Sequence, residues 1–205
     1  MRIRKLVIPV AGMGTRFLPV TKSLPKEMLP IVDVPTIQVL LDEAKNAGIE
    51  EVIFVTSERK QVILDHFKED KYLEEKLEKD GKDKLLEKVR SINKGIKISS
   101  VLQDKPLGSG HAILQAKDLV GNEAFAVMYG DDLIKGGCAL KELMEVAEKY
   151  DANVIGAQEV PYELTYKYGI ISLSDKDTLK VNGLVEKSNF KNCSGTTVLS
   201  NTANK

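Results

Sequence analysis

Apolar runs and segments with helical spacing of apolar residues alternate along most of the chain. The apolar runs predict strands at residues 5–11, 50–57, 96–103, 124–132 and 152–160. Helical spacing predicts helices at residues 37–48, 60–68 and 138–150, the first of which ends at Gly48. Runs that are apolar throughout are typical of strands buried on both faces of a sheet. The alternation therefore predicts parallel βαβ units with right-handed crossovers, and hence an α/β fold.

Two further stretches depart from this alternation. Residues 69–97 are rich in Lys and Glu with interleaved Leu, Val and Ile, which predicts one or two amphipathic helices that break near Gly81. Residues 168–174 and 178–187 are predicted to form a β-hairpin or two antiparallel strands. Residues 188–205 are polar and lack a sustained period, so we expect this tail to be irregular.

Composition excludes several classes of protein. The 205 residues are 42% hydrophobic and 29% charged, as in ordinary globular proteins, and 30 basic residues balance 30 acidic ones. This balance argues against nucleic acid or an anionic membrane as a partner. No run of about 18 apolar residues is present, so no membrane span is predicted. The two cysteines, Cys138 and Cys193, lie far apart, which favours free thiols and a cytoplasmic location.

The segment that follows the first predicted strand contains residues suited to a polyphosphate. Gly12 and Gly14 allow a tight turn and a close approach of the backbone to a ligand. Successive backbone N–H groups in such a loop form a concave site for anions. Arg16 adds a permanent positive charge, and Lys26 adds a second one ten residues later. A glycine loop with two cations matches the phosphates of a nucleotide.

Two common nucleotide motifs are absent from this segment. The dinucleotide fingerprint would require glycine at position 17, which is Phe17. The ATPase P-loop pattern does not occur in the chain. Neither a nicotinamide oxidoreductase nor a P-loop protein is favoured.

The stretch "AGMGTRFLPVTKSLPKEMLPIVDVPTIQ" resembles the signature of sugar nucleotidyltransferases, in particular the bacterial UTP–glucose-1-phosphate uridylyltransferases. The resemblance continues in order through "QDKPLGSGHA", "MYGDD", "YGIISL" and "VEK", and covers residues 1–187. It implies a Rossmann-like nucleotidyltransferase domain over these residues, with a mixed, mainly parallel sheet flanked by helices. It also implies transfer of a uridylyl group from UTP to glucose 1-phosphate, with Mg²⁺ as cofactor and pyrophosphate as second product. Full-length relatives are expected to be homo-oligomeric.

The resemblance assigns a role to individual residues. The expected catalytic residues are Arg16 and Lys26, which would contact the triphosphate, and Asp131 would bind the metal. The expected nucleotide-binding residues are Ala11, Gly12, Gly14, Thr15, Gln103, Gly108 and Ser109. Gly169, Glu186 and Lys187 would bind the sugar and its phosphate. Gln103 suits a uracil edge because an amide carries both donors and acceptors.

The family pattern stops at Lys187, where Ser188 replaces an expected proline. Full-length relatives continue for roughly a hundred residues, including a second metal-binding Asp, so we interpret the chain as a truncated member with impaired turnover. A thymidylyltransferase or another sugar nucleotidyltransferase is a second hypothesis, which a comparison of UTP with dTTP would separate. A non-catalytic nucleotide-binding remnant is a third, marked by binding without release of pyrophosphate. The sequence does not select glucose over another hexose.

Overall fold

A computed structural model describes residues 2–134, 136–175, 177–186 and 199–201. These residues divide into two compact units, residues 1–144 and residues 145–205. The domain expected from the sequence covers residues 1–187, and that boundary remains a prediction.

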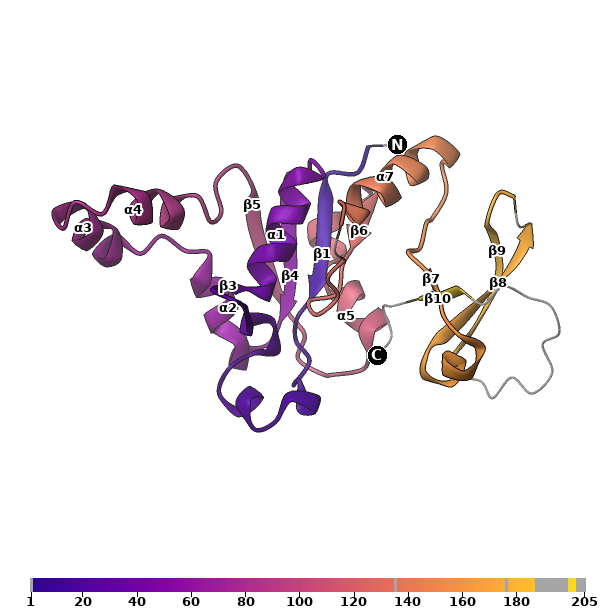
Figure 1. Cartoon of the computed structure of the whole chain (residues 1–205). Helices are drawn as coiled ribbons and strands as arrows, with labels where there is room; N and C mark the ends of the chain where they lie inside the picture. The colour runs from indigo at the N-terminus through magenta and orange to yellow at the C-terminus, as the bar shows by residue number, and fades with distance from the viewer. Residues whose placement is uncertain (1, 135, 176, 187–198, 202–205) are drawn as a thin grey trace. The chain divides into compact units, whose positions relative to one another are not determined.

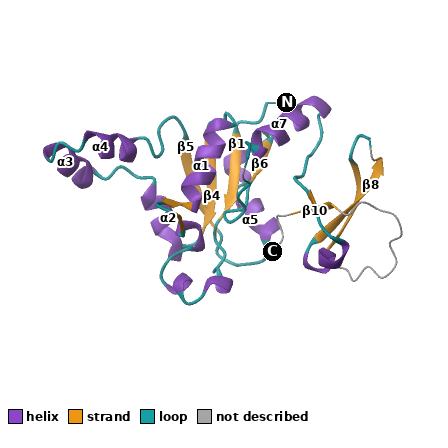
Figure 2. Ribbon diagram, in the orientation of Figure 1, coloured by secondary structure: helices purple, strands orange, loops and turns teal. Residues whose placement is uncertain are grey.

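The first unit contains a four-stranded sheet with the strand order β5-β4-β1-β6 (Figures 1 and 2). Its strands are β1 (Lys5–Pro9), β4 (Glu51–Thr56), β5 (Lys97–Leu102) and β6 (Phe125–Val127). All three strand pairs are parallel, with Lys5 opposite both Glu51 and Phe125. The expected α/β fold with a parallel sheet flanked by helices is confirmed, and the described antiparallel strands lie outside this sheet.

Three helices lie close to their predicted ranges: α1 (Thr36–Asn46), α2 (Gln61–His66) and α7 (Ala139–Tyr150). Two more, α5 (Ser109–Gln115) and α6 (Lys117–Val120), lie between β5 and β6, where no helical range was predicted. Helix α1 ends before Gly48, whose φ of +86° lies in the left-handed region that glycine adopts without strain. Three single turns of 3₁₀ helix follow β1, and a fourth precedes α2: η1 (Thr15–Phe17), η2 (Val20–Lys22), η3 (Lys26–Met28) and η4 (Glu58–Lys60). The short strands β2 (Pro30–Ile31) and β3 (Val34–Pro35) pair with each other.

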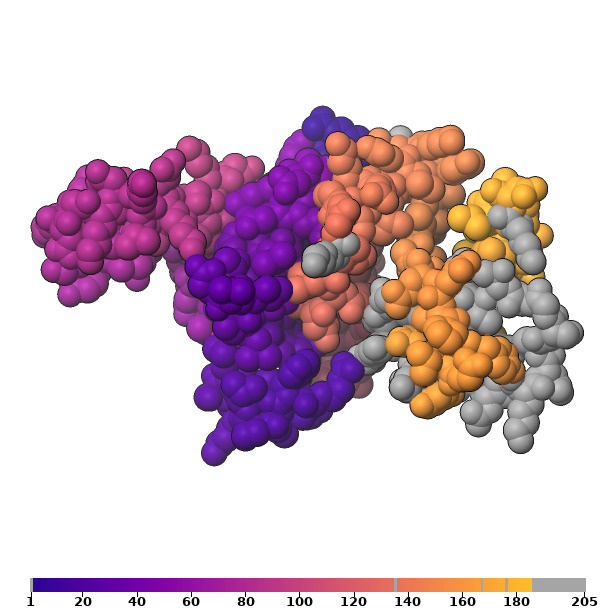
Figure 3. Space-filling model, in the orientation of Figure 1, coloured from indigo at the N-terminus to yellow at the C-terminus, as the bar shows by residue number. Residues whose placement is uncertain are grey.

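The charged stretch forms the helical pair α3 (Lys71–Lys79) and α4 (Asp83–Arg90), as predicted. The break falls at Gly81, whose φ is +66°. The pair projects from the rest of the first unit (Figure 3). Leu77 and Leu86 are buried between the two helices and their surroundings, whereas most of the Lys and Glu side chains face solvent.

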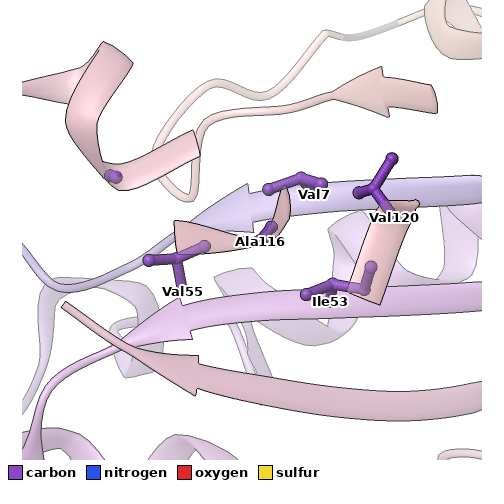
Figure 4. Packing of buried hydrophobic residues seen from close by; sticks show 6 residues of the cluster. Val7, Ile53, Val55, Ala116 and Val120 are labelled. Carbon is purple, nitrogen blue, oxygen red and sulfur yellow. The ribbon is translucent and has the colours of Figure 1, made fainter. Parts of the chain in front are cut away.

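The core of the first unit lies on both faces of the sheet. On one face, Val7, Ile53 and Val55 pack against Ala116 and Val120 of the α5–α6 segment (Figure 4). Because side chains alternate along a strand, the fully buried Phe54 faces the opposite side, where its ring stacks on Phe67 at 5.4 Å. Burial on both faces accounts for the continuous apolar runs in the sequence.

The second unit contains an antiparallel sheet with the strand order β7-β10-β8-β9. The predicted hairpin is present as β8 (Gly169–Asp175) and β9 (Lys180–Glu186), preceded by the 3₁₀ helix η5 (Tyr162–Lys167). The strand predicted at residues 152–160 is reduced to β7 (Gln158–Glu159). Within the tail that was expected to be irregular, Leu199–Asn201 forms β10, and the rest of that tail lies outside the described residues.

Candidate functional site

The candidate site lies at the carboxyl ends of β1 and β6. From β1 the chain proceeds outward to β4 and β5, and it then returns past β1 to form β6. The strand order therefore reverses between β1 and β6, which is where open α/β sheets bind their ligands. The segment with η1, η2 and η3 follows β1 at this edge, beyond the arrowheads of β1 and β4 in Figure 1. The loop with Gly130 and Asp131 follows β6.

Three of the predicted residues meet at this point. The Nζ atom of Lys26 lies 2.7 Å from Oδ2 of Asp131, and the nearest guanidinium nitrogen of Arg16 lies 3.9 Å from the same oxygen. The Lys26 side chain is 17% exposed and that of Arg16 is 57% exposed. Lys26 is thus held in a fixed position beside the carboxylate, whereas Arg16 remains accessible to an incoming anion.

Local interactions shape the loop around these charges. Gly14 has a φ of +64°, and a Cβ atom there would lie 3.2 Å from Cγ2 of Thr21. The carbonyl of Gly14 accepts a hydrogen bond from the Thr21 hydroxyl at 2.8 Å. Glycine is therefore required at position 14 for backbone conformation and for space. At the other end of the segment, the carbonyl of Leu29 accepts hydrogen bonds from the backbone N–H and the hydroxyl of Thr36, which tie the segment to α1.

The remaining residues expected to bind the nucleotide also lie in the first unit. Ala11 and Gly12 follow Val10, the first residue after β1, and a Cβ atom at Gly12 would have nothing within 4 Å. Thr15 is exposed in η1. Gln103 follows β5 and is buried, and its backbone N–H donates to the Thr56 carbonyl at 2.8 Å.

The Gln103 amide is held in place by α5. Its Nε2 lies 3.3 Å from the carbonyl oxygen of Gly108 and 3.0 Å from Nδ1 of His111. Gly108 precedes α5 with a φ of +101°, and Ser109 is the first residue of that helix. Because both amide N–H groups are directed at these partners, the Gln103 side chain has its carbonyl oxygen left as an acceptor for a planar polar ligand.

The residues predicted to bind the sugar lie in the second unit. Gly169 and Glu186 are directly opposite each other in the β8–β9 pair, so the hairpin brings these two positions together. Lys187 lies outside the described residues. The roles assigned to all three remain predictions.

The sequence and structure can be compared with those of known proteins. The family model described as "Nucleotidyl transferase" matches residues 5–204. The chain belongs to the nucleotidyl transferase family. It is 50% identical over 189 residues to the UTP–glucose-1-phosphate uridylyltransferase of Staphylococcus haemolyticus, and this match covers 91% of the chain and 66% of that protein. The predicted resemblance is confirmed, and the chain spans about two thirds of the length of this relative.

Solved structures of similar proteins agree with this membership. The nucleotidyl transferase chain matches a UTP-bound UGPase from Acinetobacter baumannii with a TM-score of 0.91 and 38% identity, covering 98% of this chain and 73% of that one. It matches a UDP-glucose pyrophosphorylase complexed with UDP-glucose with a TM-score of 0.80 and 36% identity, covering 97% and 75%. No described helix of the present chain is both long and apolar enough to cross a membrane.

The structure of this nucleotidyl transferase also brings residues to the site that the sequence analysis did not select. Glu27 is fully buried beside Lys26 and forms an ion pair with Lys60 at 2.8 Å. A Cβ atom at Gly130 would lie 2.8 Å from Cγ of Glu27, so Gly130 is packed against that side chain. Gly130 directly precedes Asp131 in the sequence, and this position indicates that Gly130 lies at the site. Nothing in the local sequence around Lys60 indicates its partner, which lies 33 residues away.

Proposed function

We propose that this chain binds UTP at the edge formed by β1 and β6, and that it transfers the uridylyl group to glucose 1-phosphate. A phosphate oxygen of the sugar phosphate attacks the α-phosphorus of UTP. The bond from the α-phosphorus to the oxygen that bridges to the β-phosphate breaks, and pyrophosphate leaves. No protein nucleophile is needed, so the residues act by positioning the substrates and neutralising charge.

The observation that carries the proposal is the convergence of Lys26, Arg16 and Asp131 at the switch point of the sheet. Lys26 and Arg16 supply cations for the triphosphate, and the backbone of Gly12 and Gly14 lets the phosphates approach closely. We assign the uracil edge to Gln103. The UTP-bound and UDP-glucose-bound relatives support this choice of nucleotide and sugar. Gly169 and Glu186 are assigned to the sugar by the same resemblance.

Asp131 is the carboxylate assigned to Mg²⁺. Among the described residues, no cluster of three or more His, Cys, Asp or Glu side chains forms a metal site. Mg²⁺ at nucleotide sites is commonly bound by one or two carboxylates together with phosphate oxygens and water. A single carboxylate therefore fits a metal that arrives with the nucleotide. When bound, the ion would neutralise charge on the phosphates.

Isothermal titration of the chain with UTP and MgCl₂ tests the first half of the proposal. Lys26→Ala should weaken UTP binding by roughly 10- to 100-fold, because a charge-assisted hydrogen bond contributes about 1.5–3 kcal/mol. Lys22→Ala, which removes an equal charge from an exposed position in η2, is the matched control and should change the affinity less than about twofold. Equal effects of the two substitutions would contradict the assignment of Lys26.

Release of pyrophosphate after addition of glucose 1-phosphate tests the second half. Turnover that Lys26→Ala abolishes supports the proposed reaction. Replacing UTP with dTTP tests the choice of base, and UTP should be favoured. Tight UTP binding without release of pyrophosphate would contradict catalysis by this chain and leave nucleotide binding as its activity.

A further inference from the structure

A buried ion pair lies directly beneath the candidate site. Glu27 has no exposed surface, and the side chain of Lys60 is 8% exposed. Oε2 of Glu27 accepts a hydrogen bond from Nζ of Lys60 at 2.8 Å, and Oε1 has no hydrogen-bond partner among the described residues. Burying two charges is costly, and apolar residues of similar volume often stabilise a protein better than such a pair does. Stability alone therefore does not account for the pair.

Glu27 of this pair is connected to two of the three charged residues of the site, Lys26 and Asp131. Glu27 is the next residue after Lys26 in η3, so the position of its side chain constrains the backbone that carries Lys26. On its other side, Cγ of Glu27 packs against Gly130, which precedes Asp131. One buried side chain thus lies against the backbone next to each of the two residues that form the 2.7 Å contact.

The charge state of the pair does not change this arrangement. Burial raises the pKa of Glu27 and lowers the pKa of Lys60, and their mutual attraction opposes both shifts. An ionic pair and a neutral pair hold the same number of protons, and either form keeps a hydrogen bond between the two side chains.

We propose that Glu27 and Lys60 are positioning residues that hold Lys26 and Asp131 in place before the nucleotide arrives. This inference rests on the proposed function, because it assigns the held groups to the triphosphate. Groups that are fixed before binding lose less conformational freedom when the ligand binds. The pair should therefore increase the affinity for the triphosphate and leave the affinity for the rest of the nucleotide unchanged.

The test compares binding of UTP and UMP by isothermal titration, and its readout is the ratio of the Kd for UMP to the Kd for UTP. In Lys60→Met, which removes the hydrogen-bond donor, we expect this ratio to fall roughly three- to thirty-fold while the Kd for UMP stays within about twofold. Lys60→Arg keeps the charge and the hydrogen bond, so it should restore most of the ratio. Glu74→Gln is the matched control, because Glu74 is also a mostly buried carboxylate in an ion pair, with Arg90 of the α3–α4 pair. It should leave the ratio unchanged.

The double variant Glu27→Leu/Lys60→Met separates positioning from stability. We expect it to unfold at the same temperature as the wild type or higher, because a packed apolar pair replaces buried charges, and still to show the reduced ratio. A double variant that is folded and has the wild-type ratio would overturn the inference.

The wild-type ratio distinguishes this inference from the proposed function. A wild-type ratio near one would overturn the proposed triphosphate site, and the inference would fail with it. A high wild-type ratio that persists in Lys60→Met would overturn the inference alone. A fall in affinity for UMP equal to that for UTP would show that the pair only supports the fold, which also overturns it.

Discussion

Gly130 provides a sharp test of the packing beneath the site. A Cβ atom at this position would lie 2.8 Å from Cγ of Glu27 and 3.1 Å from Cγ1 of Val10. Both neighbours are buried, with exposed fractions of 0% and 1%. Its φ lies outside the left-handed region, so a substitution is resisted by the lack of space and not by backbone conformation.

Gly130→Ala should lower the free energy of unfolding by about 1–3 kcal/mol, which is the usual cost of adding a methyl group to a packed core. For a chain of this size, that cost corresponds to a fall in Tm of roughly 2–12 °C. Gly110→Ala is the control, because a Cβ atom in that helical position would have nothing within 4 Å. It should raise the free energy of unfolding by up to about 1 kcal/mol, since alanine favours helix more than glycine does.

Urea unfolding followed by circular dichroism at 222 nm is the appropriate assay. Helices α1 to α6 all lie within residues 1–144, so the helical signal chiefly reports the unit that contains Gly130. If Gly130→Ala matches the wild type within about 0.5 kcal/mol, the Glu27 side chain moves at little cost. That result would refute the argument that this contact fixes the site.

Two other predictions concern stability. The pKa of His66 is lowered below its ordinary value of 6.5 by burial, so between these two values the unfolded chain holds a proton that the native chain lacks. The free energy of unfolding should therefore fall as the pH drops from about 6.5 to the pKa of His66 in the native chain, and it should then level off. Urea titrations should show a smaller fall in His66→Gln. An equal fall in both proteins would contradict the assignment of this pH dependence to His66. Val32 has a φ of +62° and is 95% exposed, so a β-branched residue there is strained without gaining burial. Val32→Asn should raise the free energy of unfolding by about 1 kcal/mol, measured as a shift in Tm, and a lower Tm would count against strain at this turn.

The sequence predicted the elements of the first unit well, and the physical reason is their burial. Strands such as β1 and β4 are covered on both faces, so their apolar runs are continuous. Such runs allow the ranges of the strands to be predicted from the sequence. The strand at residues 152–160 was predicted from the same kind of run, yet only Gln158–Glu159 pairs with a neighbour. Local apolar character does not ensure a partner strand, because partners are set by contacts distant in sequence.

The residues of the site were likewise predicted only in part from the sequence. Arg16, Lys26 and Asp131 were selected by their motifs, and the structure brings them together. Glu27 and Lys60 were not selected, because a charged residue in a polar-looking segment normally faces solvent. Their burial depends on the packing of η3 against η4 and the Gly130 loop, which no local pattern encodes.

The strand order of the first unit has a consequence for synthesis on the ribosome. β1 leaves the exit tunnel first and gains its neighbours β4 and β5 early, whereas its other neighbour, β6, is made last. Lys5 of β1 pairs with Phe125 of β6, so more than a hundred residues are translated between the two partners. Parallel pairing must await both strands, and one edge of β1 therefore stays unpaired during that time. Asp131 emerges only after β6. Until then, the ion pair between Lys26 and Asp131 cannot form, so the charged centre of the site is completed only after the last strand of its sheet.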